Sequence, residues 1–317
     1  MKILAIESSC DETSVAIVED GKNVLCNVVY TQIEFHKQYG GVVPEVASRH
    51  HIAKITYVID AAMKEAGINY SNLDYIAVTS EPGLIGSLMV GVNAAKTIGL
   101  AYNIPVVMVN HIYGHIYANY LESDFAFPLI ALVVSGGHTE LVLMKEHFHF
   151  TILGETLDDA VGEAYDKIAR VVNVGYPGGP VIDKMAKLGH PVYPLPHIKL
   201  SKDSYNFSFS GLKSAVINLY NKSKEKGEDL NYNDLAASFQ DAVIDVLVSK
   251  TLKAAKEYQA KQVIIAGGVS ANSGLRQKMK EEIEKLNIKF TVPSLKNCTD
   301  NAAMIGVAGY FQILCDK

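Results

Sequence analysis

The sequence predicts an α/β protein that contains two copies of one structural unit. Each copy opens with two apolar stretches joined by a short polar turn, at residues 2–18 and again at residues 129–144. This pattern is typical of a β-hairpin. Each copy continues with an apolar strand, a glycine-containing turn and a helix, at residues 75–102 and from residue 263 onward. A repeat of this length indicates two similar domains with a cleft between them.

The first copy contains short apolar runs bounded by polar or glycine-rich turns, which favour strands, and longer segments that favour helices. Its predicted elements are strands at residues 2–7 and 14–18, a strand at 75–79, a helix at 88–102, a strand at 104–109 and a helix after Asn110. Asn110 is placed to cap that last helix, because its side chain can accept backbone N–H groups of the first turn.

The second copy repeats this order. Its predicted elements are strands at residues 129–134 and 141–144, a strand at 263–266, a helix from 274, a strand at 289–292 and a closing helix at 302–314. Extra material at residues 151–231 separates the hairpin from the later elements. We therefore expect a first domain at residues 1–109, completed by a C-terminal helix at 302–317, and a second domain at residues 110–301.

The composition is that of an ordinary globular protein. The chain has 317 residues, of which 49% are hydrophobic and 20% charged, and its net charge is −5. This balance does not indicate a nucleic-acid binder, so an RNA contact would need a local patch or a partner. The four cysteines form no CxxC pair, which favours a reducing cytosol. We find no signal peptide and no membrane-spanning stretch, so we expect a cytoplasmic location and no membrane contact.

His111 and His115 are the first candidate for a metal site. They are four residues apart on a predicted helix, so both imidazoles leave the same face. A third ligand is needed, and the repeat places Asp300 where the histidine helix stands in the other copy. If the two copies face each other, two histidines and a carboxylate form a three-ligand site with open positions. The alternative is that the histidines are satisfied by hydrogen bonds and Asp300 caps a helix.

Two glycine turns suit a nucleotide. Ser135, Gly136 and Gly137 place backbone N–H groups at a tight turn, and Gly267 with Gly268 does so near a helix start. Such turns also simply close hairpins, but two of them in one duplicated chain favour a nucleotide in the cleft. The sequence contains no GxxxxGK[ST] motif, so the site is not a P-loop.

Asp166 and Asp183 lie in the extra material between the two copies. Acidic side chains in nucleotide sites accept hydrogen bonds from ribose hydroxyls, so these two are candidates for that role. The alternative is that the acid-rich helix around Asp166 is a solvated surface.

Three other functions fit parts of the sequence. A zinc peptidase needs a glutamate directly after the first histidine, where this chain has Ile112. A small-molecule kinase on the same fold would use Mg²⁺ and carboxylates rather than imidazoles. A scaffold protein could use the helix at residues 52–67, whose apolar face is either a partner surface or part of the core. That face includes Ile55, Ile59 and Met63.

Eight motifs in order carry a resemblance to a known family. They are IESSCDET at residues 6–13, the His111/His115 pair, VSGGHT at 134–139, GEAYDK at 162–167, YPGGP at 176–180, FSFSGLK at 207–213, GGVSAN at 267–272 and Asp300 with Asn301. The chain resembles, over nearly its whole length, the bacterial branch of the TsaD family, the tRNA adenosine threonylcarbamoyltransferases.

The resemblance implies an actin-like ATPase (ASKHA) fold of two duplicated RNase H-like domains with a cleft between them. It implies transfer of a threonylcarbamoyl group from threonylcarbamoyl-AMP to N6 of adenosine 37 of tRNAs that read ANN codons, in the biosynthesis of t6A. It implies one divalent metal ion, Fe(2+) with Zn(2+) as the alternative, held by His111, His115 and Asp300. An adenine nucleotide (threonylcarbamoyl-AMP, AMP or ATP) would occupy the cleft. The residues similar to the family's substrate contacts are Val133, Val134, Ser135, Gly136, Gly137, Asp166, Gly179, Asp183 and Asn272.

Asp11 and Glu12, at the tip of the first hairpin, are the candidates for accepting a proton. The partners implied by the resemblance are tRNA, a TsaB-like inactive homologue and a TsaE-like ATPase, in a homodimer or a heterotetramer. A possible RNA-facing strip, or equally a solvated surface, runs from His197 through Lys199, Lys202 and Lys213 to Lys222.

Overall fold

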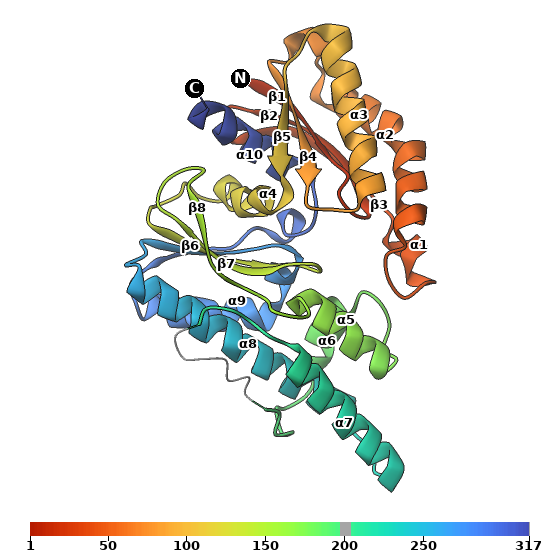
Figure 1. Ribbon diagram of the computed structural model, residues 1–317, viewed down its shortest axis with the longest axis vertical. Helices are drawn as coiled ribbons and strands as arrows, with labels where there is room; N and C mark the ends of the chain where they lie inside the picture. The colour runs from red at the N-terminus through yellow and green to blue at the C-terminus, as the bar shows by residue number, and fades with distance from the viewer. Residues whose placement is uncertain (197–203, 317) are drawn as a thin grey trace. The chain divides into compact units, whose positions relative to one another are not determined.

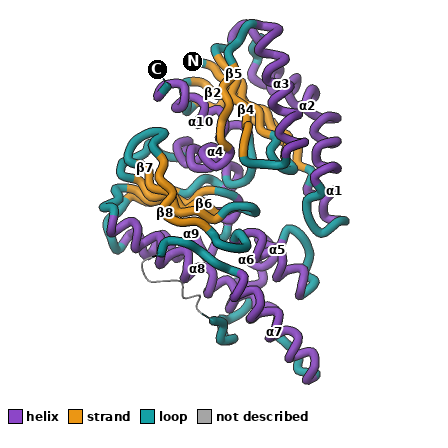
Figure 2. The backbone as a smooth tube through the Cα atoms, viewed as in Figure 1, coloured by secondary structure: helices purple, strands orange, loops and turns teal. Residues whose placement is uncertain are grey.

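The computed structural model describes residues 1–196 and 204–316 and divides into two compact units. Unit 1 comprises Met1–Asp124 and Pro293–Lys317, and unit 2 comprises Phe125–Val292. Each unit has its own five-stranded sheet, drawn as a separate group of orange strands in Figure 2. No helix in the described ranges is long and apolar enough to cross a membrane.

The sheet of unit 1 has the strand order β3-β2-β1-β4-β5. Its strands are β1 (Lys2–Glu7), β2 (Glu12–Glu19), β3 (Asn23–Thr31), β4 (Tyr75–Glu81) and β5 (Val106–Asn110). The first three strands pair antiparallel, and β4 and β5 run parallel to β1. The carboxyl ends of β1, β4 and β5 therefore lie at one edge of the sheet, where side chains from all three can meet.

Helices cover both faces of this sheet (Figure 1). They are α2 (Pro44–Ala66), α3 (Ile85–Tyr102), α4 (His111–Ala118) and α10 (Ala302–Cys315), and a short helix α1 (Ile33–Lys37) follows β3. Leu4 and Ile6 face the core that α2 and α3 cover, whereas the intervening Ala5 faces α10 at Gly306. This alternation follows from the two-residue period of a strand. Short 3₁₀ segments complete the unit at Tyr70–Asn72, Asn119–Leu121 and Leu295–Asn297.

Unit 2 repeats the topology of unit 1, with the strand order β8-β7-β6-β9-β10. Its strands are β6 (Leu129–Val134), β7 (Thr139–Met144), β8 (Phe150–Glu155), β9 (Gln262–Ala266) and β10 (Lys289–Thr291). Its helices are α5 (Val161–Val171), α6 (Gly178–Ala186), α7 (Ser210–Lys226), α8 (Tyr232–Glu257) and α9 (Ser273–Glu284), with a 3₁₀ turn η3 (Gly268–Ala271). The duplication predicted from the sequence is therefore confirmed by strand order and by pairing sense.

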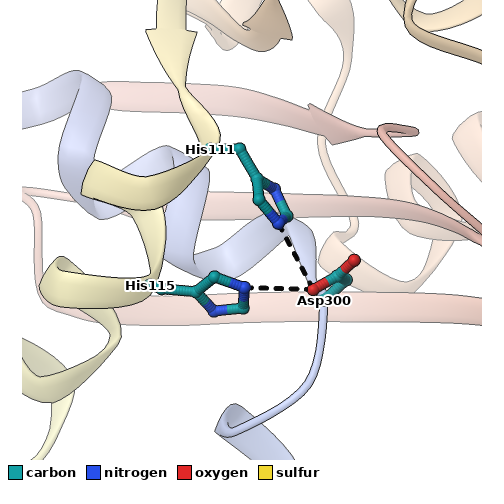
Figure 3. A group of neighbouring side chains, drawn as sticks. All are labelled: His111, His115 and Asp300. Atoms are coloured by element: carbon teal, nitrogen blue, oxygen red, sulfur yellow. Dashed lines mark ion pairs between the residues drawn. The ribbon is translucent and has the colours of Figure 1, made fainter. Parts of the chain in front are cut away.

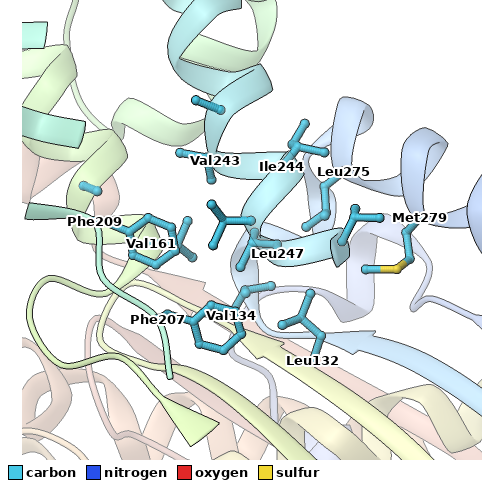
Figure 4. Close-up of a cluster of buried hydrophobic side chains, with 14 of the residues drawn as sticks. Leu132, Val134, Val161, Phe207, Phe209, Val243, Ile244, Leu247, Leu275 and Met279 are labelled. Carbon is cyan, nitrogen blue, oxygen red and sulfur yellow. The ribbon is translucent and has the colours of Figure 1, made fainter. Parts of the chain in front are cut away.

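The core of unit 2 joins the sheet to α8, α9 and the segment before α7 (Figure 4). Leu132 and Val134 of β6 pack with Leu247 of α8, and Phe207 and Phe209 are fully buried in the same cluster. Burying a large apolar side chain stabilises a fold by roughly 1.5–3 kcal/mol. The two phenylalanines therefore account for the alternation of aromatic and serine residues in the FSFSGLK motif.

Asp158 fixes the same segment from its polar side. Its carboxylate accepts hydrogen bonds from the backbone N–H groups of Phe209 and Ser210, at 2.7 and 3.2 Å, and from the hydroxyls of Ser208 and Ser210. Its neighbour Asp159 contacts Lys167 and Lys213. These hydrogen bonds lower the pKa of Asp158 although burial opposes the shift. The two acidic residues therefore anchor this segment of the chain.

The expected domain limits differ from the two units. Residues 110–124 and 293–301 belong to unit 1, whereas the sequence prediction placed them in the second domain. The physical reason is that α4 packs against α10, and α10 lies on the sheet of unit 1. The first residues of the expected insertion lie in β8 (Phe150–Glu155), which pairs with β7. Both β3 and β8 are partly exposed edge strands, so their burial pattern is weak.

The other expected elements lie close to their predicted positions. The helix predicted at residues 52–67 extends from Pro44 to Ala66, and its Ile55, Ile59 and Met63 are buried in the core of unit 1. This outcome supports the core interpretation of that apolar face. None of the four cysteines, all of which lie in the described residues, forms a disulfide.

Replacing Glu155 with glutamine should stabilise unit 2 at neutral pH. Glu155 pairs directly with Glu140 across β7 and β8, and burial together with this neighbouring charge raises the pKa of Glu140. Because the pKa of Glu140 is higher in the folded than in the unfolded protein, the free energy of unfolding falls as pH rises from the unfolded to the folded pKa. Removing a like charge at a cross-strand pair is worth about 0.2–1 kcal/mol. Calorimetry should show a higher Tm for Glu155→Gln at pH 7 and no gain at pH 4, and an equal gain at both would contradict this account.

Candidate functional site

The histidine helix begins directly after the edge of the unit 1 sheet. Asn110 ends β5, and its side chain accepts hydrogen bonds from the backbone N–H groups of Ile112 and Tyr113, at 2.9 and 3.3 Å. The predicted cap is therefore confirmed. Gly114 lies between the two histidines, where a Cβ would be 2.6 Å from Ile305 of α10. The absence of a side chain at this position lets α4 and α10 approach closely, which brings Asp300, two residues before α10, to the histidines.

His111, His115 and Asp300 form one compact group (Figure 3). One ligand atom from each residue lies within 4.8 Å of the other two. Asp300 Oδ1 is 3.5 Å from His111 Nε2 and 3.1 Å from His115 Nε2. Among the described residues, no other group of three or more His, Cys, Asp or Glu side chains comes together in this way.

The group has the properties of a metal-binding site. His115 is 1% exposed, and neither of its ring nitrogens makes a hydrogen bond of acceptable geometry, although Asp300 is within ion-pair distance. A buried imidazole without hydrogen bonds is costly unless something else coordinates it. The helix cap is Asn301, which accepts the backbone N–H of Met304, so Asp300 is not required for capping. The three side chains therefore fit a divalent ion held by two nitrogens and an oxygen.

Glu7, which the sequence analysis did not single out, orients His111. It ends β1 and is fully buried, with Oε2 lying 3.0 Å from His111 Nδ1. It also accepts hydrogen bonds from the Ser9 backbone N–H and the Thr79 hydroxyl, at 2.5 and 2.6 Å. A histidine that donates Nδ1–H to a carboxylate presents Nε2 to a metal, as in many metal sites. The sequence signal was present only as a polar residue at the end of a buried strand.

The charges of the site reinforce this arrangement. Burial opposes charge on both Glu7 and His111, but their mutual attraction lowers the pKa of Glu7, and with Asp300 it raises the pKa of His111 to about 9. Burial and the neighbouring carboxylates of Asp11 and Asp300 raise the pKa of Glu12 well above its ordinary value. The site is therefore rich in negative charge, which favours a cation.

Asp300 reaches the histidines for a different reason from the one predicted. We predicted Asp300 in the second copy, facing the first, whereas it lies in unit 1 with the rest of Pro293–Lys317. The predicted set of three residues is brought together, but it is built within one unit.

Asp11 and Glu12 lie at the start of β2, in the same unit. Thr31 donates a hydrogen bond of 3.1 Å to Glu12 Oε1. His51 of α2 holds the turn before them, since its ring nitrogens lie 2.7 Å from the Thr13 hydroxyl and 2.9 Å from the Cys10 carbonyl oxygen. The negative charge of Asp300 contributes to the raised pKa of Glu12.

The remaining predicted site residues lie in unit 2. Val133 and Val134 are fully buried in β6, so they position the turn that follows and offer no exposed surface of their own to a ligand. Gly136 and Gly137 are exposed in the following turn, and a Cβ at either position would meet nothing within 4 Å. Their backbone does not adopt the left-handed conformation that requires glycine. This open space beside bare backbone fits the close approach of a ligand rather than any need of the fold.

Asp166 and Gly179 are connected through the start of α6. The backbone N–H of Gly178 donates to Asp166 Oδ1 at 2.6 Å, and burial raises the pKa of this carboxyl. A Cβ at Gly179 would also meet nothing within 4 Å. The start of α5 also lies close to the turn of Gly136 and Gly137, since the backbone N–H of Gly162 donates to the Ser135 carbonyl at 3.2 Å.

Asp183 and Asn272 form the other part of this cluster. Ser273 donates to both carboxylate oxygens of Asp183 at 2.9 Å, and Asn272 caps α9 by accepting the Leu275 N–H. We call Ser135, Gly136, Gly137, Asp166, Gly179, Asp183 and Asn272 the unit 2 cluster. The N-termini of α5, α6 and α9 gather at it, and helix N-termini favour anions.

Part of the expected RNA-facing strip, His197, Lys199 and Lys202, lies outside the described residues. Lys213 contacts Asp159 at 2.7 Å, so its charge is partly neutralised within the chain. The structure therefore adds no support for this strip.

The duplicated sheets and the helices on their faces define an actin-like ATPase (ASKHA) fold. A family model described as TsaD, tRNA N6-adenosine threonylcarbamoyltransferase, matches residues 23–307. The chain belongs to this family, and it is a transferase that acts in tRNA modification.

Curated relatives and solved structures agree with this assignment. The chain is 60% identical to the tRNA N6-adenosine threonylcarbamoyltransferase of Bacillus subtilis (strain 168), over 98% of this chain and 90% of the relative. It is 57% identical to the corresponding Staphylococcus saprophyticus enzyme over the same shares. The structure of HypF from T. kodakarensis matches with a TM-score of 0.64 at 14% identity, covering 99% of this chain and 48% of that one. Component A of the Acidaminococcus fermentans (R)-2-hydroxyglutaryl-CoA dehydratase matches with a TM-score of 0.55 at 16% identity, covering 99% of each chain. These two likenesses concern the fold alone.

Proposed function

We propose that this protein transfers the threonylcarbamoyl group of threonylcarbamoyl-AMP to N6 of adenosine 37 in tRNAs that read ANN codons, releasing AMP. The observation that carries the proposal is the family match over residues 23–307. The donor is a mixed carbamic–phosphoric anhydride, so AMP leaves readily, whereas the exocyclic amine of adenine is a weak nucleophile. The enzyme must therefore position both reactants, stabilise developing charge and accept a proton.

His111, His115 and Asp300 would hold one divalent ion, which we propose to be Fe(2+), with Zn(2+) as the alternative. Two histidines and one carboxylate with open positions are typical of non-haem Fe(II) sites, and zinc accepts the same ligands. When bound, the ion would supply Lewis-acid polarisation of substrate oxygens. Glu7 would keep the His111 ring turned so that Nε2 faces the ligand position.

The unit 2 cluster would bind the adenine nucleotide (threonylcarbamoyl-AMP, AMP or ATP). The turn from Val133 to Gly137 would bind phosphate through the exposed backbone of Gly136 and Gly137, and Asp166 and Asp183 would accept hydrogen bonds from ribose hydroxyls. Gly179 would let the nucleotide approach the start of α6, and Asn272 would contact it from the start of α9. The open space at the glycines supports this assignment.

Asp11 and Glu12 would accept the proton that N6 loses. Burial raises the pKa of Glu12, so this carboxylate holds a proton more readily than an ordinary glutamate, as a proton acceptor should. The target adenine must leave its stack to be reached.

Two glycine substitutions separate binding from folding. Gly136→Ala should leave the free energy of unfolding unchanged or raise it by about 0.4–1 kcal/mol, because the new Cβ enters open space. It should nevertheless weaken AMP binding roughly tenfold, since that space is where we place the phosphate. Gly267→Ala should instead destabilise unit 2, because its φ is +88° and its Cβ would lie 2.4 Å from the Val134 carbonyl oxygen. Calorimetry of unfolding and of AMP binding would measure both, and unchanged AMP affinity in Gly136→Ala would contradict the assignment.

The proposed partners are tRNA, a TsaB-like inactive homologue and a TsaE-like ATPase, in a homodimer or heterotetramer. Membership of a tRNA-modifying family supports the first of them. A tRNA substrate also supports a cytoplasmic location.

The test is a transfer assay. The purified protein is supplied with threonylcarbamoyl-AMP labelled in the threonyl group and with unmodified tRNA, with and without the partner proteins. Label should appear at adenosine 37 together with stoichiometric AMP. Label that fails to enter tRNA with all partners present would contradict the proposed reaction.

A further inference from the structure

Gln240 of α8 contacts two residues of the unit 2 cluster at once. Its Nε2 lies 3.2 Å from Asp183 Oδ1, and its Oε1 lies 2.7 Å from Asn272 Nδ2. The Tyr165 hydroxyl approaches the same Oε1 at 3.5 Å. Gln240 is only 7% exposed, so its amide depends on these protein partners rather than on water.

The direction of each hydrogen bond in this network is fixed by its neighbours. Asn272 Oδ1 accepts the Leu275 N–H at 2.9 Å, so Asn272 presents its NH₂ group to Gln240. Gln240 must therefore accept this hydrogen bond with its Oε1, which turns its own NH₂ group toward the carboxylate of Asp183. The hydrogen bonds therefore run in one direction, from the first turn of α9 through Gln240 to Asp183.

Gly274 leaves the room that this network needs. A Cβ at this position would lie 3.0 Å from Gln240 Nε2 and 2.9 Å from Ile244 Cδ1. The first turn of α9 can approach α8 this closely because residue 274 has no side chain. The close approach of the α9 backbone and the hydrogen bonds of Asn272 and Asp183 therefore hold the Gln240 side chain in one position.

We propose that Gln240 is a positioning residue for the nucleotide, which holds the Asp183 carboxylate and the Asn272 amide in the arrangement that recognises adenosine. The proposal rests on the proposed function, because that function assigns Asp183 and Asn272 to the nucleotide. Gln240 acts through these two side chains. Replacing Gln240 should therefore weaken nucleotide binding and so raise the KM for threonylcarbamoyl-AMP, while kcat stays within about twofold of the wild-type value.

Gln240→Glu is the sharpest test. The new carboxylate still accepts from Asn272, but it has no hydrogen to donate to Asp183. Losing a hydrogen bond to a charged group should raise the Kd for AMP at pH 8 about tenfold, measured by calorimetry on the full chain. Two facing carboxylates share a proton more readily as pH falls, so AMP binding should recover toward the wild-type value at pH 6. General damage to the fold would not recover in this way.

Asp241→Asn is the matched control. It makes the reverse exchange of amide and acid on the neighbouring residue of α8, whose side chain is 52% exposed, and it should bind AMP as the wild type does. In an Asp183→Ala background, Gln240→Glu should raise the Kd for AMP by less than about twofold, because its effect passes through Asp183. If Gln240→Glu does not fold, Gln240→Met should give the same loss of affinity without the recovery at pH 6.

The outcomes separate the two proposals. If the wild type does not bind AMP, or if Asp183→Ala binds it as the wild type does, the nucleotide assignment itself fails and this inference fails with it. If Asp183→Ala loses affinity but Gln240→Glu and Gln240→Met keep the wild-type Kd, only the role of Gln240 is overturned. A tenfold rise in the Kd for AMP on adding Gln240→Glu to Asp183→Ala would likewise contradict the role of Gln240.

Discussion

Asp300→Ala should remove the metal and lower the transfer rate together. The carboxylate supplies the only oxygen ligand in the group, and Oδ1 faces the Nε2 atoms of both histidines. Loss of even a supporting residue of a metal site costs 10–100-fold in affinity, so losing a direct ligand should cost roughly 100-fold or more. Metal analysis of the purified variant should show substoichiometric metal, and threonylcarbamoyl transfer should fall in proportion.

Asp316→Ala is the control for this prediction. Asp316 is an exposed aspartate at the other end of α10, and its removal should change neither metal content nor rate. An Asp300→Ala protein that lost its metal and still transferred the group at the wild-type rate would show that the metal is not catalytic. One that retained the metal would show that Asp300 is not a ligand.

Glu7→Gln should weaken metal binding although Glu7 is not itself one of the three proposed ligands. The carboxylate accepts from the Ser9 N–H, the Thr79 hydroxyl and His111 Nδ1. A glutamine must turn its NH₂ group toward one of these groups. If it faces His111, it favours the tautomer in which Nε2 carries the proton and is closed to the metal. We expect a 10–100-fold loss of metal affinity, about the size measured for such supporting carboxylates, and a stability cost of about 1–3 kcal/mol for the mismatched buried hydrogen bond.

Titration of the apo protein with Fe(2+) or Zn(2+) would measure this effect, with thermal unfolding measured in parallel. Glu19→Gln, at the partly exposed end of the neighbouring strand β2, is the matched control and should behave as the wild type. Unchanged metal affinity in Glu7→Gln would mean that the orientation of His111 does not depend on Glu7.

Local patterns in the sequence predicted much of the fold. The buried strands β1, β6 and β9 and the cap of the histidine helix depend on short apolar runs and on Asn110, which act over a few residues. The edge strands β3 and β8 were missed because their burial is partial and their signal depends on a neighbouring strand. The duplication was visible because both copies keep the same order of hairpin, strand and helix.

The site was predicted in part, and the missing residues have a common cause. His111 and His115 share a helix face, which spacing alone reveals. Glu7 and Gln240 act through contacts between segments 104 and 32 residues apart, respectively, that form only when the chain folds. Asp300 was predicted, but from a symmetry argument that put it in the wrong unit. Residues whose role lies in tertiary hydrogen bonds leave no periodic signal in the sequence.

The most direct test of the metal centre is anomalous X-ray diffraction from crystals of the wild-type protein, purified without added metal and recorded on both sides of the iron and zinc absorption edges. We predict one anomalous peak per chain, within bonding distance of His111 Nε2, His115 Nε2 and an oxygen of Asp300, and we predict that it belongs to iron. A peak at the zinc edge alone would keep the site and change the metal. No peak at this group, in protein that is active in threonylcarbamoyl transfer, would contradict the account.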